Sequence, residues 1–362
     1  MQAAVCYEFG KPLVVEEIDI DSPQRGEVKV RTVATAICHS DIHLLRGDWG
    51  GTVPVVAGHE SAGIVEAVGE DVTLAKPGDH VVVSLLRSCG RCYYCMTGSP
   101  HTCEGDFPLA KGTQSRLHNG RGESLRHGIA CAAFADYMIV DQSQVVKVPD
   151  ELPLDRAALL ACGVITGLGA VTNTAKVPPR SSVVVIGAGG VGLNAVQGAV
   201  LSGAHPVIAM DLLDSKLAAA SIFGATHTLN AGRADAAEAV REWTWGRGAD
   251  YVFVTVGSAA AIAQGLTLLR REGTLVVVGI PEHTATVALP AAHTVWNQWR
   301  ILGSSMGSTR LQVDVPRLVQ LYQQGRLKLD ELITARYPLD QINQAIADVE
   351  AGKALRNVIT FA

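Results

Sequence analysis

The segment Val-Val-Val-Ile-Gly-Ala-Gly-Gly-Val-Gly, residues 183–192, decides the fold of the second half of this chain. Its first four residues are apolar and β-branched, which is typical of a strand buried in a parallel sheet. The glycines that follow permit a tight turn, and the apolar residues after them open a helical stretch. A second apolar run lies at 207–210. The segment therefore predicts a strand, a helix and a second strand of one parallel sheet.

Residues 181–210 contain no Asp, Glu, Lys or Arg, so their length and composition would also suit a membrane span. They nevertheless include six glycines and the polar residues Asn194, Gln197 and His205. Such a run favours a strand, helix and strand buried inside a folded domain. We therefore expect no association with a membrane.

The pattern of the sequence changes near residue 152. Short strand-like runs separated by turn signals come first, and apolar runs that alternate with helical segments follow, so we expect a β-rich domain and an α/β domain with a doubly wound parallel sheet. After about residue 300 the composition is mixed again. The expected strands are 27–35, 63–68, 78–84, 183–186, 207–210, 251–256, 275–280 and 357–361, and the expected late helices are 315–324 and 341–351.

Length and composition narrow the class of protein. The chain has 362 residues, a formal net charge of −5, 48% hydrophobic residues and 18% charged residues. These values predict two to three domains and argue against a disordered chain or a nucleic-acid binder. The first residues lack a basic head followed by an apolar run, so we expect a cytoplasmic protein. In that compartment, eight cysteines indicate metal binding or catalysis rather than disulfides.

Four of the cysteines, Cys89, Cys92, Cys95 and Cys103, lie within fifteen residues. Four thiolates can surround one tetrahedral ion and leave no position for water or substrate, which is typical of structural zinc. An iron–sulfur cluster and disulfides are the alternatives. The ferredoxin pattern ends in C-x3-C-P, however, whereas here seven residues separate Cys95 from Cys103, and Glu104 follows Cys103.

The glycines at 187, 189 and 192 form a G-x-G-x-x-G pattern between the expected strand and helix. Glycines there let backbone N–H groups approach a pyrophosphate at the start of a helix. Asp211 ends the next expected strand, where a carboxylate accepts both ribose hydroxyls and repels a 2′-phosphate, so NAD is favoured over NADP. Lys216 could reach the ribose. A packed turn without a ligand is the alternative.

Three dispersed residues, Cys38, His59 and Cys162, offer two thiolates and one imidazole. Taken singly, each is more often a buried apolar cysteine or a satisfied histidine. Together they would make a three-ligand zinc site with an open fourth position, as in catalytic zinc. Asp41 and Glu60 are close enough in sequence to orient the ligands or tune the metal.

These motifs resemble those of the zinc-containing medium-chain alcohol dehydrogenases over essentially the whole chain. Residues 58–69 are similar to the signature around that family's zinc histidine, and the four-cysteine lobe, Cys162 and the glycine pattern follow in the family's order. The resemblance implies a GroES-like β-rich catalytic domain into which a Rossmann domain is inserted. We expect the catalytic domain at 1–163, with a zinc lobe at about 87–105, completed by 303–362, and the NAD-binding domain at 164–302.

The resemblance also implies a reaction and a proton path. A hydride would pass from an alcohol to NAD, and the proton would leave through Ser40 and the nicotinamide ribose to His43, with two zinc ions per chain, one catalytic and one structural. The alternatives are that Ser40 caps a helix beginning near Asp41 and that His43 is a surface residue.

Further residues are assigned to the dinucleotide only by the resemblance. His39 stands where well-known members carry an Arg that grips the pyrophosphate, so we expect weaker NAD binding than in an Arg variant. Arg356 is implied as a second pyrophosphate contact. The remaining residues implied near the cofactor are Thr166, Gly190, Val191, Val278 and Ile280.

The substrate pocket is implied to contain Trp49 and Leu85, with Ile280 and Leu109 nearby. An apolar slot with one polar end suits primary aliphatic or aromatic alcohols and their aldehydes. Trp49 replaces an acid of the glutathione-dependent formaldehyde branch, which disfavours that branch. A polyol or secondary-alcohol dehydrogenase and a non-catalytic NAD-binding sensor are the remaining alternatives.

The stretch 104–133, with glycines at 112, 120, 122 and 128, resembles the extended loop of the family's dimeric branch. A loop of this length is usually functional or lies at an interface. We expect a homodimer first and a homotetramer second. Cys6 and Cys131 receive no function.

Overall fold

The computed structural model describes residues 1–111 and 114–361, so Gly112 lies outside the described residues. The chain divides into two compact units. Unit 1 comprises Met1–Cys162, Arg310–Gly325 and Leu329–Ala362, and unit 2 comprises Gly163–Thr309 and Arg326–Lys328. The chain thus returns to unit 1 at residue 310, later than the sequence-based boundary at 303.

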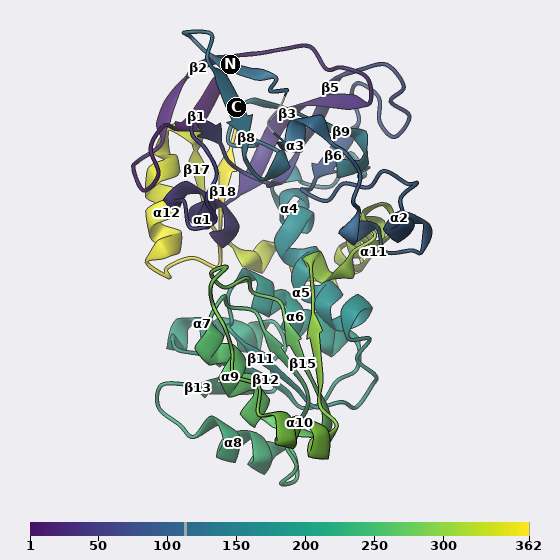
Figure 1. Ribbon diagram of the computed structural model, residues 1–362, viewed down its shortest axis with the longest axis vertical. Helices are drawn as coiled ribbons and strands as arrows, with labels where there is room; N and C mark the ends of the chain where they lie inside the picture. Colours follow the sequence, from purple (N-terminus) through teal and green to yellow (C-terminus); the bar gives the residue numbers. More distant parts are fainter. Residues whose placement is uncertain (112–113, 362) are drawn as a thin grey trace. The chain divides into compact units, whose positions relative to one another are not determined.

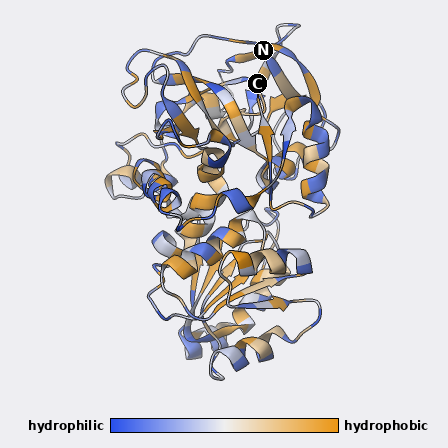
Figure 2. Cartoon of the chain, turned by 180° about the vertical axis from the view of Figure 1, so that it is seen from behind, coloured by the Kyte–Doolittle hydropathy of each residue, from blue (hydrophilic) through white to orange (hydrophobic). Residues whose placement is uncertain are grey.

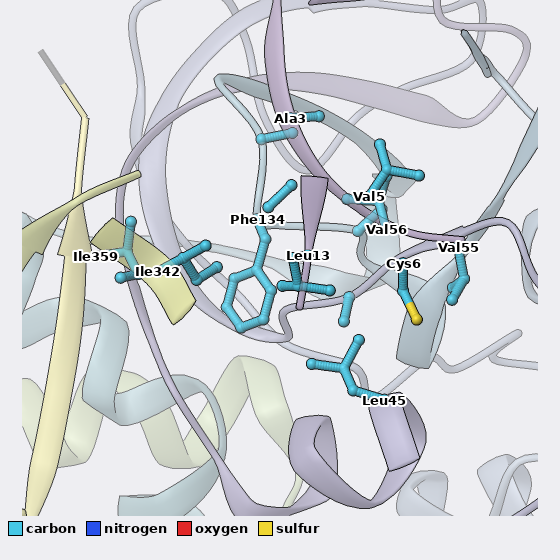
Figure 3. Packing of buried hydrophobic residues seen from close by; sticks show 14 of the residues in the cluster. Ala3, Val5, Cys6, Leu13, Leu45, Val55, Val56, Phe134, Ile342 and Ile359 are labelled. Atoms are coloured by element: carbon cyan, nitrogen blue, oxygen red, sulfur yellow. The ribbon is translucent and has the colours of Figure 1, made fainter. Parts of the chain in front are cut away.

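Unit 1 contains a closed five-stranded barrel (Figure 1). Phe134 lies at the centre of its apolar core, among side chains from the first strand, from α1 (His39–Arg46) and from α12 (Ile342–Glu350) (Figure 3). Every strand of the barrel contributes buried apolar side chains to this core, including Leu117 from β7 and Leu125 from β8. The barrel strands, in spatial order, are β1 (Gln2–Cys6), β2 (Val14–Ile20), β7 (Leu117–Asn119), β8 (Ser124–His127) and β4 (Val55–Val56).

A seven-stranded sheet forms the rest of the β-structure of unit 1. Its register brings three segments together, because Ala36 at the end of β3 lies opposite Glu60 on one side and Val358 on the other. Cys38 lies two residues after Ala36, and is therefore close to Glu60 and to the strand that carries Arg356. The strands are β10 (Val145–Lys147), β6 (His80–Val83), β5 (Glu60–Val68), β3 (Glu27–Ala36), β18 (Arg356–Thr360) and β17 (Ile333–Pro338), with β9 (Tyr137–Asp141) also paired to β3.

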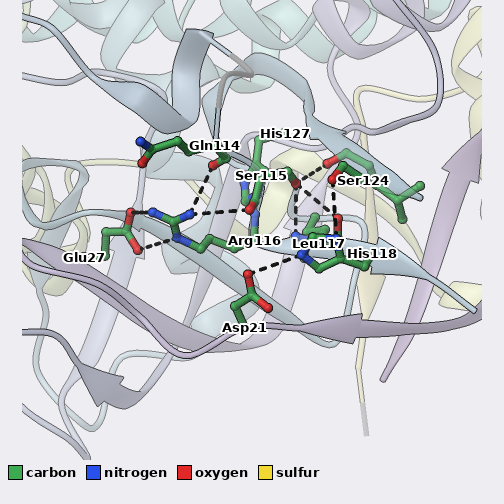
Figure 4. Close-up of polar contacts among 10 residues, drawn as sticks. Asp21, Glu27, Gln114, Ser115, Arg116, Leu117, His118, Ser124 and His127 are labelled. Atoms are coloured by element: carbon green, nitrogen blue, oxygen red, sulfur yellow. Dashed lines mark hydrogen bonds and ion pairs between the residues drawn. The ribbon is translucent and has the colours of Figure 1, made fainter. Parts of the chain in front are cut away.

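The stretch 104–133 is not the extended loop that the sequence predicts. It contains α3 (Pro108–Lys111) and the antiparallel pair β7 and β8, which completes the barrel. Arg116 anchors this hairpin, because its guanidinium binds the Glu27 carboxylate on β3 through Nε at 3.0 Å and Nη2 at 2.9 Å (Figure 4). Both side chains are buried. The strands were missed because they are short and carry polar residues.

Unit 2 is built on a six-stranded parallel sheet with the order β13-β12-β11-β14-β15-β16. This is the strand order of a doubly wound dinucleotide-binding fold, so the predicted fold class is confirmed. The strands are the most hydrophobic part of the unit (Figure 2). They are β11 (Val183–Ile186), β12 (Val207–Asp211), β13 (His227–Asn230), β14 (Ala249–Val254), β15 (Leu269–Val277) and β16 (Arg300–Gly303).

Helices follow the strands of unit 2 as the alternating pattern predicts. The strand–helix–strand unit at 183–211 is confirmed, whereas β15 ends at Val277 rather than at residue 280. The helices of unit 2 are α5 (Ile165–Gly169), α6 (Gly190–Leu201), α7 (Asp214–Ile222), α8 (Ala236–Trp243), α9 (Ala259–Thr267) and α10 (Ala291–Asn297). The other helices of unit 1 are α2 (Tyr93–Met96), α4 (Leu154–Leu159) and α11 (Leu311–Gln323).

One helical run, Leu154–Thr174, is long and apolar enough to cross a membrane. Within its most apolar window, 89% of the residues are buried in the protein. Burial of this kind is typical of a core helix, and the run is interrupted by a π-helical turn at Leu160–Val164 that carries Cys162. The helix therefore gives little support to a membrane span.

Candidate metal centre and nucleotide site

Four side chains of unit 1 converge on one point. One ligand atom from each of Cys38, His59, Glu60 and Cys162 lies within 4.8 Å of the others, and all four residues are buried. Cys38 precedes α1, His59 immediately precedes β5, Glu60 begins that strand, and Cys162 lies in the π-helical turn. The structure thus brings together the three dispersed ligands and places Glu60 beside them.

Asp41 holds two of these segments in place. The carboxylate is fully buried and accepts hydrogen bonds from the backbone N–H groups of Cys38 at 3.1 Å and Gly58 at 3.0 Å. It also lies 2.9 Å from His59 Nδ1. A carboxylate can only accept here, so Nδ1 carries the proton and Nε2 keeps its lone pair for a ligand. Asp41 therefore orients His59 as the sequence suggests.

Gly58 explains the close turn before His59. Its backbone is left-handed, with φ +94, and a Cβ there would lie 2.7 Å from the backbone nitrogen and ring of Phe134. Only glycine suits both conditions without strain. The Gly58-His59 pair is therefore fixed between Asp41 and the barrel core.

The titratable groups of this cluster are strongly perturbed. The hydrogen bond from Cys162 holds the pKa of the Cys38 thiol well below its usual range and, together with burial, raises that of Cys162. Burial is the largest single effect on His59 and lowers its pKa, but the charges and hydrogen bonds of Asp41 and Cys38 together outweigh burial and raise the pKa. Burial raises the pKa of Glu60 to about 8, against the opposing charge of Arg356.

The residues fit a divalent metal ion. Among the described residues, His59 Nε2 and both carboxylate oxygens of Glu60 are buried without a hydrogen-bond partner, although Arg356 Nη2 lies 3.4 Å from Glu60 Oε1. Unpaired buried acceptors beside two thiols are costly unless a cation compensates them. Sulfur and imidazole donors are those that zinc prefers, and Cys38, His59 and Cys162 would hold it.

The four-cysteine lobe is a second convergent set. The sulfurs of Cys89, Cys92, Cys95 and Cys103 lie within 4.8 Å of one another, and none of the eight cysteines, all in the described part of the chain, forms a disulfide. Backbone N–H groups point at the sulfurs, for example Cys92 to Cys89 at 3.3 Å. Hydrogen bonds from the Cys95 and Glu104 backbones lower the pKa of Cys92 to about 6. The set fits a closed tetrahedral zinc site.

Of the three motif glycines in the turn of unit 2, only Gly189 has room for a Cβ atom. A Cβ on Gly192 would lie 1.7 Å from the Gly187 carbonyl oxygen, and one on Gly187, with φ +95, would contact Val256 and Thr255. A Cβ on Gly189 would have no heavy atom within 4 Å. Gly189 immediately precedes α6, so open space lies at the helix N-terminus, where a pyrophosphate would fit.

Asp211 and its neighbours form the edge of this site. Asp211 ends β12 and accepts the Ala188 N–H at 2.7 Å and the Leu213 N–H at 3.0 Å. Lys216 follows in the first turn of α7. Sequence analysis missed Arg233, which lies 22 residues after Asp211 but binds Asp214 at 2.8 Å. Its guanidinium is thus already paired with a carboxylate.

The predicted relay residues lie on α1. This helix begins at His39 with Cys38 as its N-cap, so Ser40 lies inside the first turn and does not cap the helix. The His43 side chain is 35% exposed, its Nδ1 lies 2.7 Å from Asp48 Oδ2, and its ring stacks on Trp49 with centroids 5.4 Å apart. His43 is therefore an anchored residue rather than a free surface histidine. Sequence analysis did not single out Asp48.

The remaining predicted residues are placed as follows. His39 is exposed at the start of α1, whereas Arg356 is buried beside Glu60, a contact that the sequence did not predict. The pyrophosphate contact of Arg356 stays a prediction. In unit 2, Thr166 Oγ1 lies 3.6 Å from Met306 Sδ. Val278 is buried and Ile280 exposed after β15, while in unit 1 Leu109 is buried and Leu85 packs against the sheet core.

Comparison with known proteins assigns the family. Residues 24–150 match the alcohol dehydrogenase GroES-like domain, and residues 190–324 match the zinc-binding dehydrogenase domain. The NDMA-dependent alcohol dehydrogenase of Amycolatopsis methanolica is 40% identical, over 99% of this chain and 98% of that protein. The chain belongs to the zinc-containing medium-chain alcohol dehydrogenases. The predicted family, alcohol dehydrogenase activity and GroES-like domain are thereby confirmed.

Two further relatives show the range of names in this family. The S-(hydroxymethyl)glutathione dehydrogenase of Saccharomyces cerevisiae is 38% identical, over 99% of this chain and 95% of that protein. The crystal structure of benzyl alcohol dehydrogenase from Acinetobacter calcoaceticus is 36% identical and superimposes with a TM-score of 0.93, over 100% of this chain and 99% of that one. Substrate choice therefore has to be argued from the residues of this chain.

Proposed function

We propose that this alcohol dehydrogenase is a zinc enzyme that oxidises primary aliphatic or aromatic alcohols to aldehydes with NAD, and reduces aldehydes in reverse. The observation that carries the proposal is the convergence of Cys38, His59 and Cys162 with an unpaired, correctly oriented His59 Nε2. A non-catalytic sensor would have no need to preserve this set together with His43.

Bound zinc would supply a Lewis acid that favours loss of the alcohol proton. Residues of the chain orient the ligands and move the proton. Asp41 keeps the His59 lone pair on Nε2, and Glu60 and Arg356 place one carboxyl group and one guanidinium beside the ligands. Oxidation releases one proton for each hydride transferred, and His43, which is partly open to water, can accept that proton and pass it to solvent.

NAD rather than NADP is the proposed nucleotide. The Asp211 carboxylate would repel a 2′-phosphate, and its orientation is fixed by two backbone N–H groups. The nearby Arg233 is paired with Asp214, which reduces its capacity to attract that phosphate. Lys216, Thr166, Val191, Val278 and Ile280 remain proposed contacts of the same nucleotide.

Primary alcohols are favoured by the two pocket residues of unit 1. Trp49 and Leu85 are apolar, and Trp49 stands at the position of an acid in the glutathione-dependent branch. The benzyl alcohol dehydrogenase comparison supports an aromatic substrate, and the S-(hydroxymethyl)glutathione dehydrogenase comparison supports the glutathione adduct as the second candidate. Polyols and secondary alcohols fit an apolar slot less well.

A homodimer is the proposed assembly, with a homotetramer as the second possibility. Strand β16 ends the sheet order of unit 2, and Ile301 on it is 43% exposed. Val295 and Trp296 on α10 are 73% and 76% exposed. An open strand edge beside exposed apolar residues is usually covered in the assembled protein. Sedimentation of the wild type against Trp296→Glu tests this, since the variant should lose the dimer.

The proposed cellular site is the cytoplasm, because both thiol sets must stay reduced to bind metal and a reducing compartment keeps them so. Cell fractionation with an antibody tests it: recovery of the protein in the cytosolic fraction is expected, and recovery outside the cytoplasm contradicts it.

The function is tested by counting zinc and following NADH absorbance with ethanol, benzyl alcohol, sorbitol and the formaldehyde–glutathione adduct. We expect two zinc ions per chain and turnover of ethanol or benzyl alcohol. Cys38→Ala should lose one zinc and the activity. Cys131→Ala is the matched control, because Cys131 is buried with a pKa raised to about 12 but lies in neither thiol set. One zinc and no turnover in the wild type would overturn the proposal.

A further inference from the structure

The end of α1 folds Asp48 back onto the helix. Gly47 is left-handed, with φ +79, and its N–H binds the Leu44 carbonyl at 3.0 Å, while the Asp48 N–H binds the His43 carbonyl at 3.0 Å. These two bonds form a Schellman motif, which ends a helix with a defined geometry. The backbone of Asp48 is therefore tied to the residue whose side chain its carboxylate also contacts.

The side chains extend this arrangement. Asp48 Oδ2 lies 2.7 Å from His43 Nδ1, and the Trp49 indole stacks on the imidazole at an interplanar angle of 28°. The segment Gly47-Asp48-Trp49 at the end of α1 thus restrains one histidine by a backbone bond, a carboxylate and an aromatic face. A histidine with only a structural surface role would not need all three.

We propose that Asp48 is a positioning residue that holds the proton of neutral His43 on Nδ1 and so keeps Nε2 as the proton acceptor. The inference rests on the proposed function, because it concerns the base that takes the alcohol proton. The carboxylate accepts the Nδ1 hydrogen, so the lone pair can only lie on Nε2. When Nε2 takes up one proton, the ring becomes a cation beside the Asp48 anion, and the same proton then leaves Nε2 for water.

The surrounding charges support this division of roles. Arg46 is the last residue of α1, and its Nη2 lies 2.6 Å from Oε1 of Glu350, so its charge is paired with that carboxylate. Asp48 is therefore the charge in contact with the His43 ring. The side chains of His43 and Asp48 are 35% and 34% exposed, so water can reach the pair and the loss of one hydrogen bond should cost about tenfold in rate.

The tautomer is read directly by NMR. In protein labelled with 15N-histidine and loaded with zinc, at a pH where His43 is neutral, the His43 shifts should show Nδ1–H, with the signals assigned by His43→Gln. Asp48→Asn should shift the ring toward Nε2–H, because an amide can also donate. Asp21→Asn is the matched control, since Asp21 contacts another exposed histidine, His118, at 3.3 Å. An unchanged His43 tautomer in Asp48→Asn would overturn the proposal.

Kinetics complete the test. Asp48→Asn should lower kcat for the best alcohol about tenfold with little change in KM, Asp48→Glu should recover part of the loss, and Asp21→Asn should match the wild type. A changed tautomer with an unchanged kcat would also overturn the positioning role. If the wild type oxidises no alcohol, the proposed function fails, whereas the NMR result still decides how Asp48 orients His43.

Discussion

Replacing Gly189 by alanine should separate nucleotide binding from stability in unit 2. The new Cβ meets no heavy atom within 4 Å, and the backbone at φ −81 and ψ −170 suits any residue. We therefore expect the free energy of unfolding to fall by less than about 1 kcal/mol, the cost of a poorer helix start. The methyl group would occupy the space in front of α6 that the pyrophosphate needs.

The expected loss of binding follows from the hydrogen bonds at that position. If the methyl group prevents one backbone N–H from reaching a phosphate oxygen, about 1.5–3 kcal/mol is lost. At 1.4 kcal/mol per factor of ten, the Kd for NAD should rise about 10- to 100-fold.

Gly192→Ala supplies the contrast. Its Cβ would lie 1.7 Å from the Gly187 carbonyl oxygen, so the turn or the helix has to move. We expect a loss of at least about 3 kcal/mol, which lowers Tm by roughly 6–12 °C in a unit of this size.

Calorimetric titration with NAD and thermal unfolding measured on the same samples check both variants. The reasoning fails if Gly189→Ala binds NAD as tightly as the wild type, or if Gly189→Ala unfolds at a lower temperature than Gly192→Ala. The first result would mean that the phosphates do not lie in the open space at Gly189, and the second that a methyl group is not accommodated there.

Three further predictions concern the two sets of zinc ligands, His39 and the buried His127. Cys38→Ser should halve the zinc content with a small change in Tm, whereas Cys92→Ser should unfold the four-cysteine lobe and lower Tm. Metal analysis and thermal unfolding measure both effects. Equal destabilisation by the two variants would contradict two different zinc roles. His39→Arg should lower the Kd for NAD several-fold, because a permanently charged guanidinium replaces an imidazole, and an unchanged Kd would refute the role of His39. Burial and the Arg116 charge lower the pKa of His127 to about 4 in the folded protein. Between about pH 6.5 and 4 the unfolded chain therefore binds more protons at this residue than the folded protein does. The free energy of unfolding should fall by about 3 kcal/mol as the pH drops over that range. Urea titrations over that range should show a smaller drop for His127→Gln, and the same drop would contradict the assignment.

The parts of the fold that the sequence predicts are those with strong periodicity. The apolar runs at 183–186 and 207–210 each correspond to a buried strand, because a parallel sheet covered on both faces requires continuous apolar residues, and the glycine pattern corresponds to the turn between β11 and α6. The strands β7 and β8 were missed for the opposite reason. They are three and four residues long, each contains one leucine among polar residues, and the residue before β7, Arg116, is buried in an ion pair with Glu27.

The candidate site shows the same division. Residue type, together with the resemblance of their segments to the family's motifs, selected Cys38, His59 and Cys162, because few residue types bind zinc. The contacts of Arg356 with Glu60 and of Asp48 with His43 depend on strand pairing and on a helix cap. The spacing of Gly47 after His43 was the available signal for the second contact, since a glycine that ends a helix brings the next residue back toward its last turn. No local signal existed for the first.

The bonds of Asp41 have a consequence for metal exchange. This one carboxylate fixes the backbone before α1, the backbone at Gly58 and the His59 ring without help from a cation. The set of Cys38, His59 and Cys162 should therefore keep its shape when stripped by a chelator, and cobalt should enter it by simple addition. The four-cysteine lobe is held mainly by N–H contacts to its own sulfurs, so it should lose its shape on stripping and refill slowly. Chelation followed by cobalt addition should label the Cys38, His59 and Cys162 set selectively.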